Sequence, residues 1–464
     1  MINDFFEISQ RVFPAGKDIV FTIRGRYEQQ NLSILAQEGK LRMCIIADSG
    51  MFADGNIMRR GKYKECRIRL DGDVLIVEYE AQNEGEYYLS LELVKEDAAG
   101  NESITAVAAF DIYVLEDDLF KLRPLKGDMH VHTSFSQCGS KTDSPEYVCA
   151  TARAKGLDYI SVTDHIQIEG SESVADFSAR FNSSFAVYSG EECHVLSEKL
   201  ESRFCRNIFL RPVHIVNFGG NDGVCRYANE HYDEFHAQVS EKAEKIELPY
   251  DFETRYLMAA SDWICDKIHE FGGLAIFCHP FWRANHMCNM PHAIGQYILQ
   301  QGKFDMMEVV GLGLPADDPR QRGMTESINL ALAWWQDASI RQARNIPVVG
   351  NTDTHNAANV LGSKYTIVFA AENTYSGIYE AFKKGLSVAV MNVDGIAPQV
   401  YGQFRLVHYA HFLLRNFYPG HDELCAAEGR MMQAVLRGEF KEESIAGLEF
   451  CNASDKYTEQ FFGK

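Results

Sequence analysis

Closely spaced metal-binding side chains occupy the segment Lys126–Thr133, whose sequence is KGDMHVHT. Asp128, His130 and His132 are two residues apart, so on a β-strand all three point to one face. Two imidazoles and a carboxylate that converge in this way suit a divalent metal better than a packed core. We therefore expect this segment to contribute to a metal site.

Similar side chains end or interrupt short apolar runs further along the chain. They are His165, Glu192, His214, His279, Asp353 and His355. Continuous β-branched runs are typical of parallel strands, and in (β/α) barrels the functional residues gather at the C-terminal ends of the strands. The pattern predicts one metal site assembled from many strands.

The types of these ligands limit the metal. Mixed imidazole and carboxylate donors suit Zn, Mn, Fe or Co better than Mg or Ca. Two such ions about 3.5–4 Å apart can share a bridging hydroxide and stabilise both the attacking and the leaving oxygen of a displacement. The ligand set is therefore compatible with metal-ion chemistry of this kind.

Charge and composition restrict the partners. The 464 residues include 65 acidic and 45 basic ones, for a net charge of -20. This balance disfavours nucleic acid, except short oligonucleotides, because nonspecific binding to it depends on many Lys and Arg contacts. A small phosphorylated substrate stays compatible, since bound metals would supply local positive charge.

The cysteines and the apolar runs indicate a cytoplasmic protein. The 12 cysteines include no C-x-x-C pair, which leaves zinc-ribbon and thioredoxin-like folds unsupported. The N-terminus lacks the pattern of a signal peptide, and no apolar run approaches the length of a membrane span. We expect no membrane partner; the oligomeric state is not indicated.

The chain is predicted to have three parts. Residues 1–120 contain short β-prone runs separated by turn signals such as Asp71-Gly72, which predicts a sandwich-like accessory domain. Residues 121–397 alternate between strands and helices, as in a βα architecture. Ser144–Gly156, for example, has a serine N-cap, a proline at N1 and a terminal glycine. Residues 398–464 read as a helical extension.

The ordered motifs resemble those of the polymerase-and-histidinol-phosphatase (PHP) family. In sequence order they are H-x-H-T, T-D-H, G-x-E, an internal histidine, C-H-P and T-D-x-H, at residues 130–133, 163–165, 190–192, 214, 278–280 and 352–355. The resemblance covers residues 122–395. It implies a distorted (β/α)7, TIM-like barrel with two or three divalent ions, which hydrolyses small phosphomonoesters or short nucleotides by attack of a metal-bridging hydroxide.

The resemblance also implies a role for each candidate. Glu192 would bridge two ions; His130, His132 and Asp353 would hold one of them, and His214 and His279 the other. His165 and His355 would hold a third ion, or contact substrate and donate a proton if that ion is absent. Asp128 is expected to orient a ligand imidazole, and His194 to have a core or orienting role.

One position departs from the family pattern. Many relatives carry an acidic ligand of the third metal five residues after the second histidine of the first motif, where this chain has Gln137. The next residue, Cys138, occupies a position at which some family members have a histidine. A thiolate there would bind zinc, whereas a free cysteine is the commoner outcome. Two-metal and three-metal sites both stay open.

Arg283 is the candidate for a phosphate clamp, because a guanidinium matches phosphate oxygens in a bidentate geometry.

Two other classes of function stay open, because a fold does not determine the reaction that a protein catalyses. One is an amidohydrolase-like enzyme that cleaves a C–N or C–O bond, and the other is a binding module that metals stabilise. The sequence does not identify the substrate.

Overall fold

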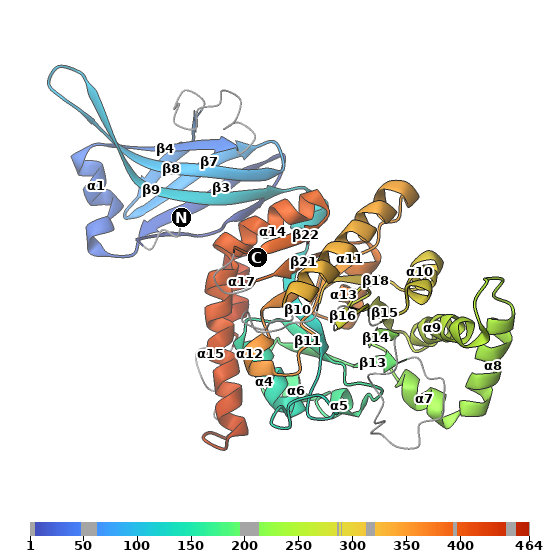
Figure 1. The fold of residues 1–464 in the computed structure, drawn as a ribbon. Helices are drawn as coiled ribbons and strands as arrows, with labels where there is room; N and C mark the ends of the chain where they lie inside the picture. The colour runs from blue at the N-terminus through green and yellow to red at the C-terminus, as the bar shows by residue number, and fades with distance from the viewer. Residues whose placement is uncertain are drawn as a thin grey trace. The chain divides into compact units, whose positions relative to one another are not determined.

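The computed structural model describes residues 5–47, 63–194, 213–284, 287–288, 290–311, 321–392, 397–441 and 452–463. The chain divides into two compact units (Figure 1). The smaller unit comprises residues 1–122, 408–421 and 453–464, and the larger comprises residues 123–407 and 422–452. The tail predicted as a separate helical extension is thus divided between the units. It also begins with a strand, β22 (Gln399–Gly402).

Two β-sheets form most of the smaller unit. One has the order β1 (Phe6–Ile8), β3 (Lys17–Gly25), β7 (Val74–Ala81) and β6 (Arg67–Asp71). The other has the order β2 (Val12–Pro14), β9 (Glu102–Leu115), β8 (Gly85–Glu96), β4 (Lys40–Ala47) and β5 (Lys64–Glu65). Buried side chains of both sheets, such as Phe21 and Leu89, belong to one core. The prediction of a β-rich N-terminal region is confirmed.

The larger unit also contains two main sheets. The first has the order β12 (Ala186–Tyr188), β11 (Tyr159–Val162), β10 (Arg123–Val131), β20 (Lys364–Ala370), β21 (Ser387–Met391) and β22. The second has the order β13 (Gly190–His194), β14 (His214–Phe218), β15 (Leu274–Phe277), β18 (Met306–Val310) and β19 (Val348–Gly350). Buried residues of both sheets, including Met129 and Ile276, share one core.

The expectation that the strands run parallel is correct for only part of this unit. β10, β11 and β12 are parallel, as are β15, β18 and β19. β14 is antiparallel to both of its neighbours, and β20, β21 and β22 pair antiparallel. A continuous apolar run indicates that a strand is buried on both faces. It does not indicate whether the strand runs parallel or antiparallel to its neighbours.

Two isolated bridges connect the sheets of the larger unit. Val131 pairs with Thr354 beyond the end of β19, and His165 beyond β11 pairs with Glu192 of β13. Both bridges involve segments that carry predicted metal ligands. The ends of strands from both sheets therefore meet in one region.

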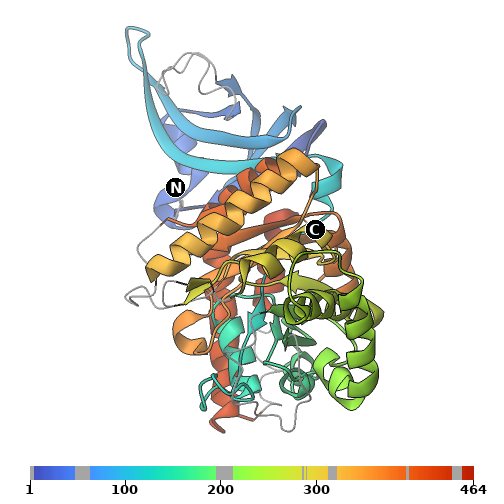
Figure 2. The same ribbon diagram turned by 45° about the vertical axis from the view of Figure 1, so that its right-hand side comes forward.

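The helices of the larger unit follow the predicted capping signals. α4 (Pro145–Ala154) begins after Ser144, whose hydroxyl accepts a hydrogen bond from the Tyr147 amide at 3.3 Å. α9 (Phe252–Glu270) and α13 (Tyr375–Lys383) precede β15 and β21. Two helices, α7 (Val224–Glu230) and α8 (Tyr232–Glu244), precede α9 and are seen with it on one side of the unit in Figure 2. Within the described residues, no helix combines the length and the hydrophobicity needed to cross a membrane.

Candidate metal centre

The structure brings all eight predicted metal ligands together. They come from the ends of strands or from the residues that follow them: His130, His132, His165, Glu192, His214, His279, Asp353 and His355. His214 is the first residue of β14, which runs antiparallel to β13 and β15. The start of β14 therefore lies beside the C-terminal ends of its neighbours, which explains a ligand at the beginning of an apolar run.

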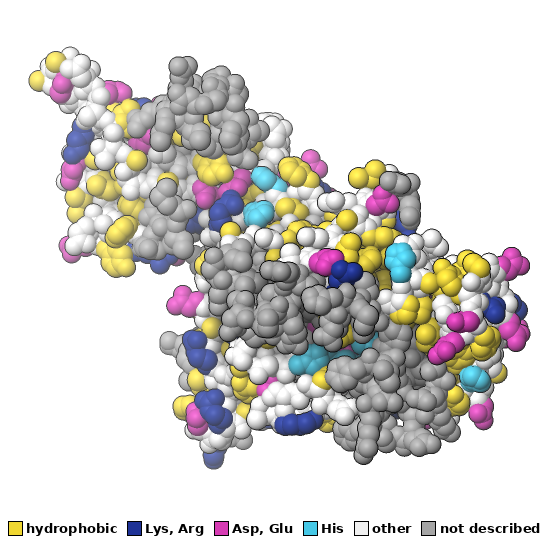
Figure 3. All heavy atoms as spheres, viewed as in Figure 1, with side chains coloured by type: hydrophobic (Ala, Val, Ile, Leu, Met, Phe, Trp, Pro, Cys, Tyr) yellow, Lys and Arg dark blue, Asp and Glu magenta, His cyan; other side chains and the backbone are white. Residues whose placement is uncertain are grey.

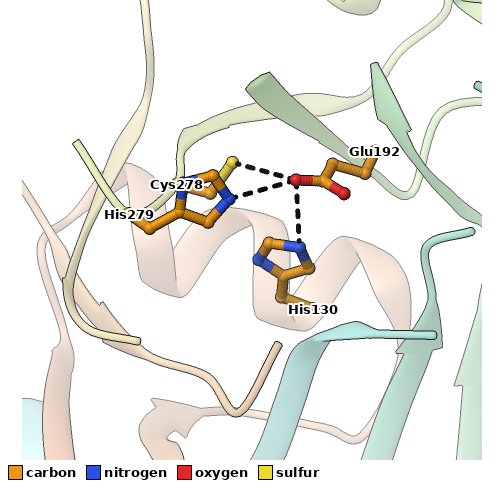
Figure 4. A group of neighbouring side chains, drawn as sticks. All are labelled: His130, Glu192, Cys278 and His279. Carbon is orange, nitrogen blue, oxygen red and sulfur yellow. Dashed lines mark hydrogen bonds and ion pairs between the residues drawn. The ribbon is translucent and has the colours of Figure 1, made fainter. Parts of the chain in front are cut away.

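The carboxylate of Glu192 lies at the middle of this cluster. Its Oε1 is 2.9 Å from His214 Nδ1, 3.1 Å from His279 Nε2 and 3.4 Å from His130 Nε2. Its Oε2 contacts His165 Nδ1 and lies 3.5 Å from His132 Nε2. Figure 4 shows His130, His279 and the thiol of Cys278 directed toward Oε1. One carboxylate thus faces five imidazoles.

Asp353 supplies a second carboxylate next to His130 and His132. Its Oδ1 lies 2.9 Å from His132 Nε2 and 3.4 Å from His130 Nε2. His130 is therefore within reach of both Glu192 and Asp353, which is the arrangement expected of a ligand between two charged oxygens. His355 follows two residues later, with Nδ1 2.9 Å from the Asp353 carbonyl.

A second group of imidazoles extends from His132. The His132 ring stacks on His165 and on His355 with centroid distances of 4.3 Å in both cases. The thiol of Cys138 contacts the imidazoles of His165 and His355. Gln137, the preceding residue, is exposed. At this departure from the family pattern, the side chain that contacts His165 and His355 is therefore the thiol of Cys138.

Burial and charge act in opposite directions on the groups of the cluster. Burial raises the pKa of Glu192, but the surrounding imidazoles of His165, His214 and His130 hold it well below its ordinary value. Burial lowers the pKa of His130, but Asp353 and Glu192 outweigh it and raise the pKa well above normal. The carboxylates thus need positive charge nearby, which either protons or a cation can supply.

The donor set fits divalent cations. His130 Nε2 is buried and makes no hydrogen bond to any described residue, although two carboxylate oxygens lie 3.4 Å away. A buried nitrogen that faces carboxylates without bonding to them has the environment of a metal ligand. The groupings His130–His132–Asp353 and His130–Glu192–Cys278–His279 each keep their donor atoms within 4.8 Å of one another.

The backbone is strained where ligands leave their strands. His279 has φ 28° and Asp353 has φ 50°, and Ile166, which follows His165, has φ 56°. Side chains rarely adopt positive φ, and such residues concentrate at functional sites. Position 190, in the G-x-E motif, has no room for a side chain, because a Cβ there would collide with Ser161 Oγ. Glycine therefore fits this position.

Glu308 is a residue of the site that the sequence analysis missed. It is buried in β18, and its Oε2 lies 3.2 Å from His130 Nδ1 and 2.9 Å from Asn351 Nδ2. Its Oε1 accepts a hydrogen bond from the His279 amide at 3.1 Å. A single acidic residue inside the apolar run MMEVV is the signal that could have found it.

The expectation that Asp128 orients a ligand imidazole is wrong. Its carboxylate accepts hydrogen bonds from the Thr352 hydroxyl at 2.5 Å, the Thr352 amide at 3.2 Å and the His130 amide at 3.1 Å. It therefore holds the backbone of two ligand segments. Asp164 of the T-D-H motif does the same for the loop after His132, with contacts of 2.6 Å to the Ser136 hydroxyl and 2.7 Å to the Thr133 hydroxyl.

His194 lies closer to the centre than expected. Its Nε2 is 2.8 Å from His165 Nδ1, and its ring stacks on His214 at 3.9 Å with an interplanar angle of 10°. The side chain is fully buried. These contacts fit the predicted orienting role, because the ring fixes the positions of two neighbouring imidazoles.

Arg283 follows the ligand His279 by four residues. It is part of the short hairpin of β16 (Arg283–Ala284) and β17 (Met287–Cys288), directly after the His279 segment. Its guanidinium forms an ion pair with Glu326 of α11 (Gln321–Gln342). The predicted phosphate clamp is thus engaged with a carboxylate.

The centre opens to solvent on one side. The side chain of His355 is 35% exposed, whereas those of His130, His132 and Glu192 are at most 1% exposed. Figure 3 shows histidine side chains at the surface of the larger unit. A small molecule would therefore approach the cluster past His355.

Comparisons with known proteins give matches only among solved structures. No family model and no curated protein matches the chain. A two-domain protein from Bacteroides vulgatus that contains a PHP-like metal-dependent phosphoesterase matches with 18% identity and a TM-score of 0.38. This match covers 59% of the present chain and 66% of the other, slightly under two thirds of its length.

Two further matches have similar scores. A metal-dependent phosphoesterase from Bifidobacterium adolescentis is 15% identical, with a TM-score of 0.33 over 55% of this chain and 94% of the other. A lesion-specific endonuclease from Pyrococcus furiosus is 16% identical, with a TM-score of 0.30 over 60% of this chain and 58% of the other. PHP-like phosphoesterases are thus among the structures similar to this chain, as the motifs predict. The function is argued from the site itself.

Proposed function

We propose that this chain is a metal-dependent hydrolase of the PHP type that cleaves a small phosphoester. The observation that carries the proposal is the position of Glu192, a fully buried carboxylate that faces five imidazoles from four different segments. A carboxylate between two sets of imidazoles suits a bridge between two ions.

The donors fall into two sets that share Glu192. His130, His132 and Asp353 would hold one ion, since their donor atoms lie within 4.8 Å of one another. His214 and His279 would hold the second, because both reach Glu192 Oε1 within 3.1 Å. Imidazole and carboxylate donors favour Zn, Mn or Fe over Mg and Ca.

Bound divalent ions would supply Lewis acidity toward the phosphoryl oxygens and make water a nucleophile at neutral pH. The chain itself holds the donors in position. Glu308 fixes the His130 ring through Nδ1, so that Nε2 faces the carboxylates. Asp128 and Asp164 accept hydrogen bonds from backbone amides of the ligand segments and so fix their positions.

Substrate would enter on the exposed side of the centre, next to His355. Arg283 is the proposed phosphate contact, and its guanidinium would exchange the Glu326 carboxylate for the phosphate. Such an exchange keeps the arginine paired in both states. Glu326 is itself exposed, so its release into water is not opposed by burial.

A distorted barrel of seven strands is part of the proposal. Neighbouring strands can be followed from β10 to β11, through the His165–Glu192 bridge to β13, and on through β14, β15, β18 and β19. The Val131–Thr354 bridge then leads from β19 back to β10. β12, β20, β21 and β22 lie outside this ring. The ring supports a barrel in which one strand, β14, is reversed.

Hydrolysis assays test the proposed reaction. Metal-loaded protein should release p-nitrophenol from p-nitrophenyl phosphate or its bis ester, and should lose this activity with Glu192→Gln while the circular dichroism spectrum stays unchanged. Hydrolysis of lactones or amides, with no phosphoester cleaved, would indicate the amidohydrolase-like class. Full metal content with no hydrolysis of any of these compounds would indicate a binding module.

A further inference from the structure

A second group of side chains that can bind metal lies on the face of β13 opposite Glu192. Glu191 and Cys193 alternate with Glu192 along the strand, so their side chains point away from the metal centre. Cys225 of α7 contacts both of them, and all three side chains are at most 2% exposed. The group therefore lies in the core between β13 and α7, and it takes no part in the proposed hydrolysis.

The donor atoms of this group have the spacing of metal ligands. Cys193 Sγ lies 3.6 Å from Glu191 Oε2, and the two thiols contact each other. In a tetrahedral zinc site, with Zn–S about 2.3 Å and Zn–O about 2.0 Å, neighbouring sulfur and oxygen ligands are about 3.5 Å apart. The carbonyl oxygen of His194 lies 3.9 Å from Cys225 Sγ and offers a neutral fourth donor.

The Glu191 carboxylate contacts no cationic group within the described part of the chain. It accepts hydrogen bonds from the Val224 amide at 2.7 Å and the Cys225 amide at 3.2 Å, and its other contacts are the two thiols. None of these groups carries a positive charge. Buried charges in proteins are paired with an opposite charge or coordinate a metal. A bound cation would supply the charge that this carboxylate lacks.

We propose that Glu191, Cys193 and Cys225 bind a zinc ion that is separate from the ions around Glu192. Thiolate ligands select zinc over magnesium and manganese, and binding would release the protons of both thiols to solvent. Closed zinc sites contribute to folding and leave no position for substrate. The ion would join α7 to the strand that carries Glu192. The inference goes beyond the proposed hydrolysis and does not depend on it.

Cobalt substitution tests the proposal without any substrate. The full-length chain with Cys138→Ser and Cys278→Ser serves as the starting protein, so that thiols near the metal centre contribute no signal. Produced in cobalt-supplemented medium, it should show a sulfur-to-cobalt charge-transfer band in the near ultraviolet. Adding Cys193→Ser or Cys225→Ser should remove this band together with one equivalent of cobalt. Cys265→Ser is the matched control, because Cys265 is buried in the same core, and it should retain both.

X-ray absorption at the zinc edge gives a second measurement that needs no substitution at the site. Sulfur neighbours should appear about 2.3 Å from zinc, in the wild-type chain and in the starting protein. Zinc without sulfur neighbours in the starting protein would overturn the inference, as would a band that persists in Cys193→Ser and Cys225→Ser. A mass lower by two hydrogens, from a disulfide between these cysteines, would also overturn it.

The outcomes separate this inference from the proposed function. A chain that hydrolyses p-nitrophenyl phosphate but shows no sulfur band in the starting protein would retain the proposed function and lose the zinc site behind β13. A chain with the band but without hydrolysis of any phosphoester would retain the zinc site and lose the proposed function.

Discussion

His130 Nδ1 lies 3.2 Å from Glu308 Oε2, while Nε2 of the same ring lies 3.4 Å from both Glu192 and Asp353. The ring thus has an orienting carboxylate on one side and the ligand carboxylates on the other. Glu308 is bound in turn by the Asn351 amide group and by the His279 backbone amide. One buried side chain therefore fixes the segments that follow β15 and β19 relative to β10.

Replacing Glu308 by Gln should weaken metal binding without removing a ligand. Outer partners of ligand imidazoles typically contribute about 10–100-fold in affinity or activity, and we expect a loss in this range. Competition titration with a chromophoric chelator measures it. Glu270→Gln is the control, because Glu270 is exposed and pairs with Lys267. Unchanged affinity in Glu308→Gln would contradict the assigned role.

Much of this centre follows from the sequence because each ligand stands beside a short apolar run. A buried strand fixes where its last residue points, so His165, Glu192 and Asp353 could be predicted to converge before any distances were known. The capping residue Ser144 likewise predicted the start of α4.

What the sequence did not reveal depends on partners distant in the chain. Asp128 bonds to Thr352, 224 positions away, and Glu308 bonds to His130, 178 positions away. Local spacing carries no information on such pairs. Strand direction was missed for the same reason, since the reversed strand β14 and the antiparallel strands β20 and β21 have the same apolar character as parallel ones.

Replacing Asp353 by Asn should reduce catalytic activity by a larger factor than Glu308→Gln reduces metal affinity. Asp353 faces His130 and His132 directly, and the amide removes the negative charge that a cation needs. We expect the loss of activity to exceed ~100-fold, the upper end for outer partners. Steady-state assays with p-nitrophenyl phosphate give the ratio of kcat/KM. Asp266→Asn, at an exposed ion pair with Lys303, should retain full activity; a similar loss in both variants would contradict the prediction.

Removal of metal should destabilise the fold. A ligand present at 100 times its Kd stabilises the native state by about 2.7 kcal/mol. Without the bound ions, the negative charges of the buried carboxylates are no longer neutralised by a cation. We expect chelator to lower the unfolding temperature of the wild-type chain, measured by circular dichroism. Glu192→Gln should respond less to chelator. An equal unfolding temperature with and without chelator would show that the cluster is stable without ions.

Asp305 gives a prediction about pH that is independent of the centre. Burial raises its pKa, but hydrogen bonds from His269, Lys383 and the Ala275 amide outweigh burial and lower it. In the unfolded chain an aspartate has a pKa of about 3.9. Because the pKa of Asp305 is lower in the folded protein, the ionised carboxylate stabilises the fold at pH values above the unfolded pKa. This stabilisation is lost as the pH falls through the pKa of the folded state. The free energy of unfolding should therefore decrease over that acidic range.

Asp305→Asn should remove this part of the acid sensitivity. Hydrogen bonds to charged groups contribute about 1.5–3 kcal/mol, and we expect the lower end, because His269 and Lys383 are 40% and 48% exposed and screened by water. Urea unfolding at neutral and acidic pH measures the difference. An equal difference between wild type and variant at both pH values would contradict the assignment.

Metal content tests the central claim most directly. Protein purified without chelator should contain at least two equivalents of Zn, Mn, Fe and Co together, measured by elemental analysis. His130→Ala should reduce this content, whereas His292→Ala, at the exposed start of α10 (His292–Gln301), should leave it unchanged. A wild-type content below one equivalent, or equal contents in both variants, would contradict the account of this cluster as a metal centre.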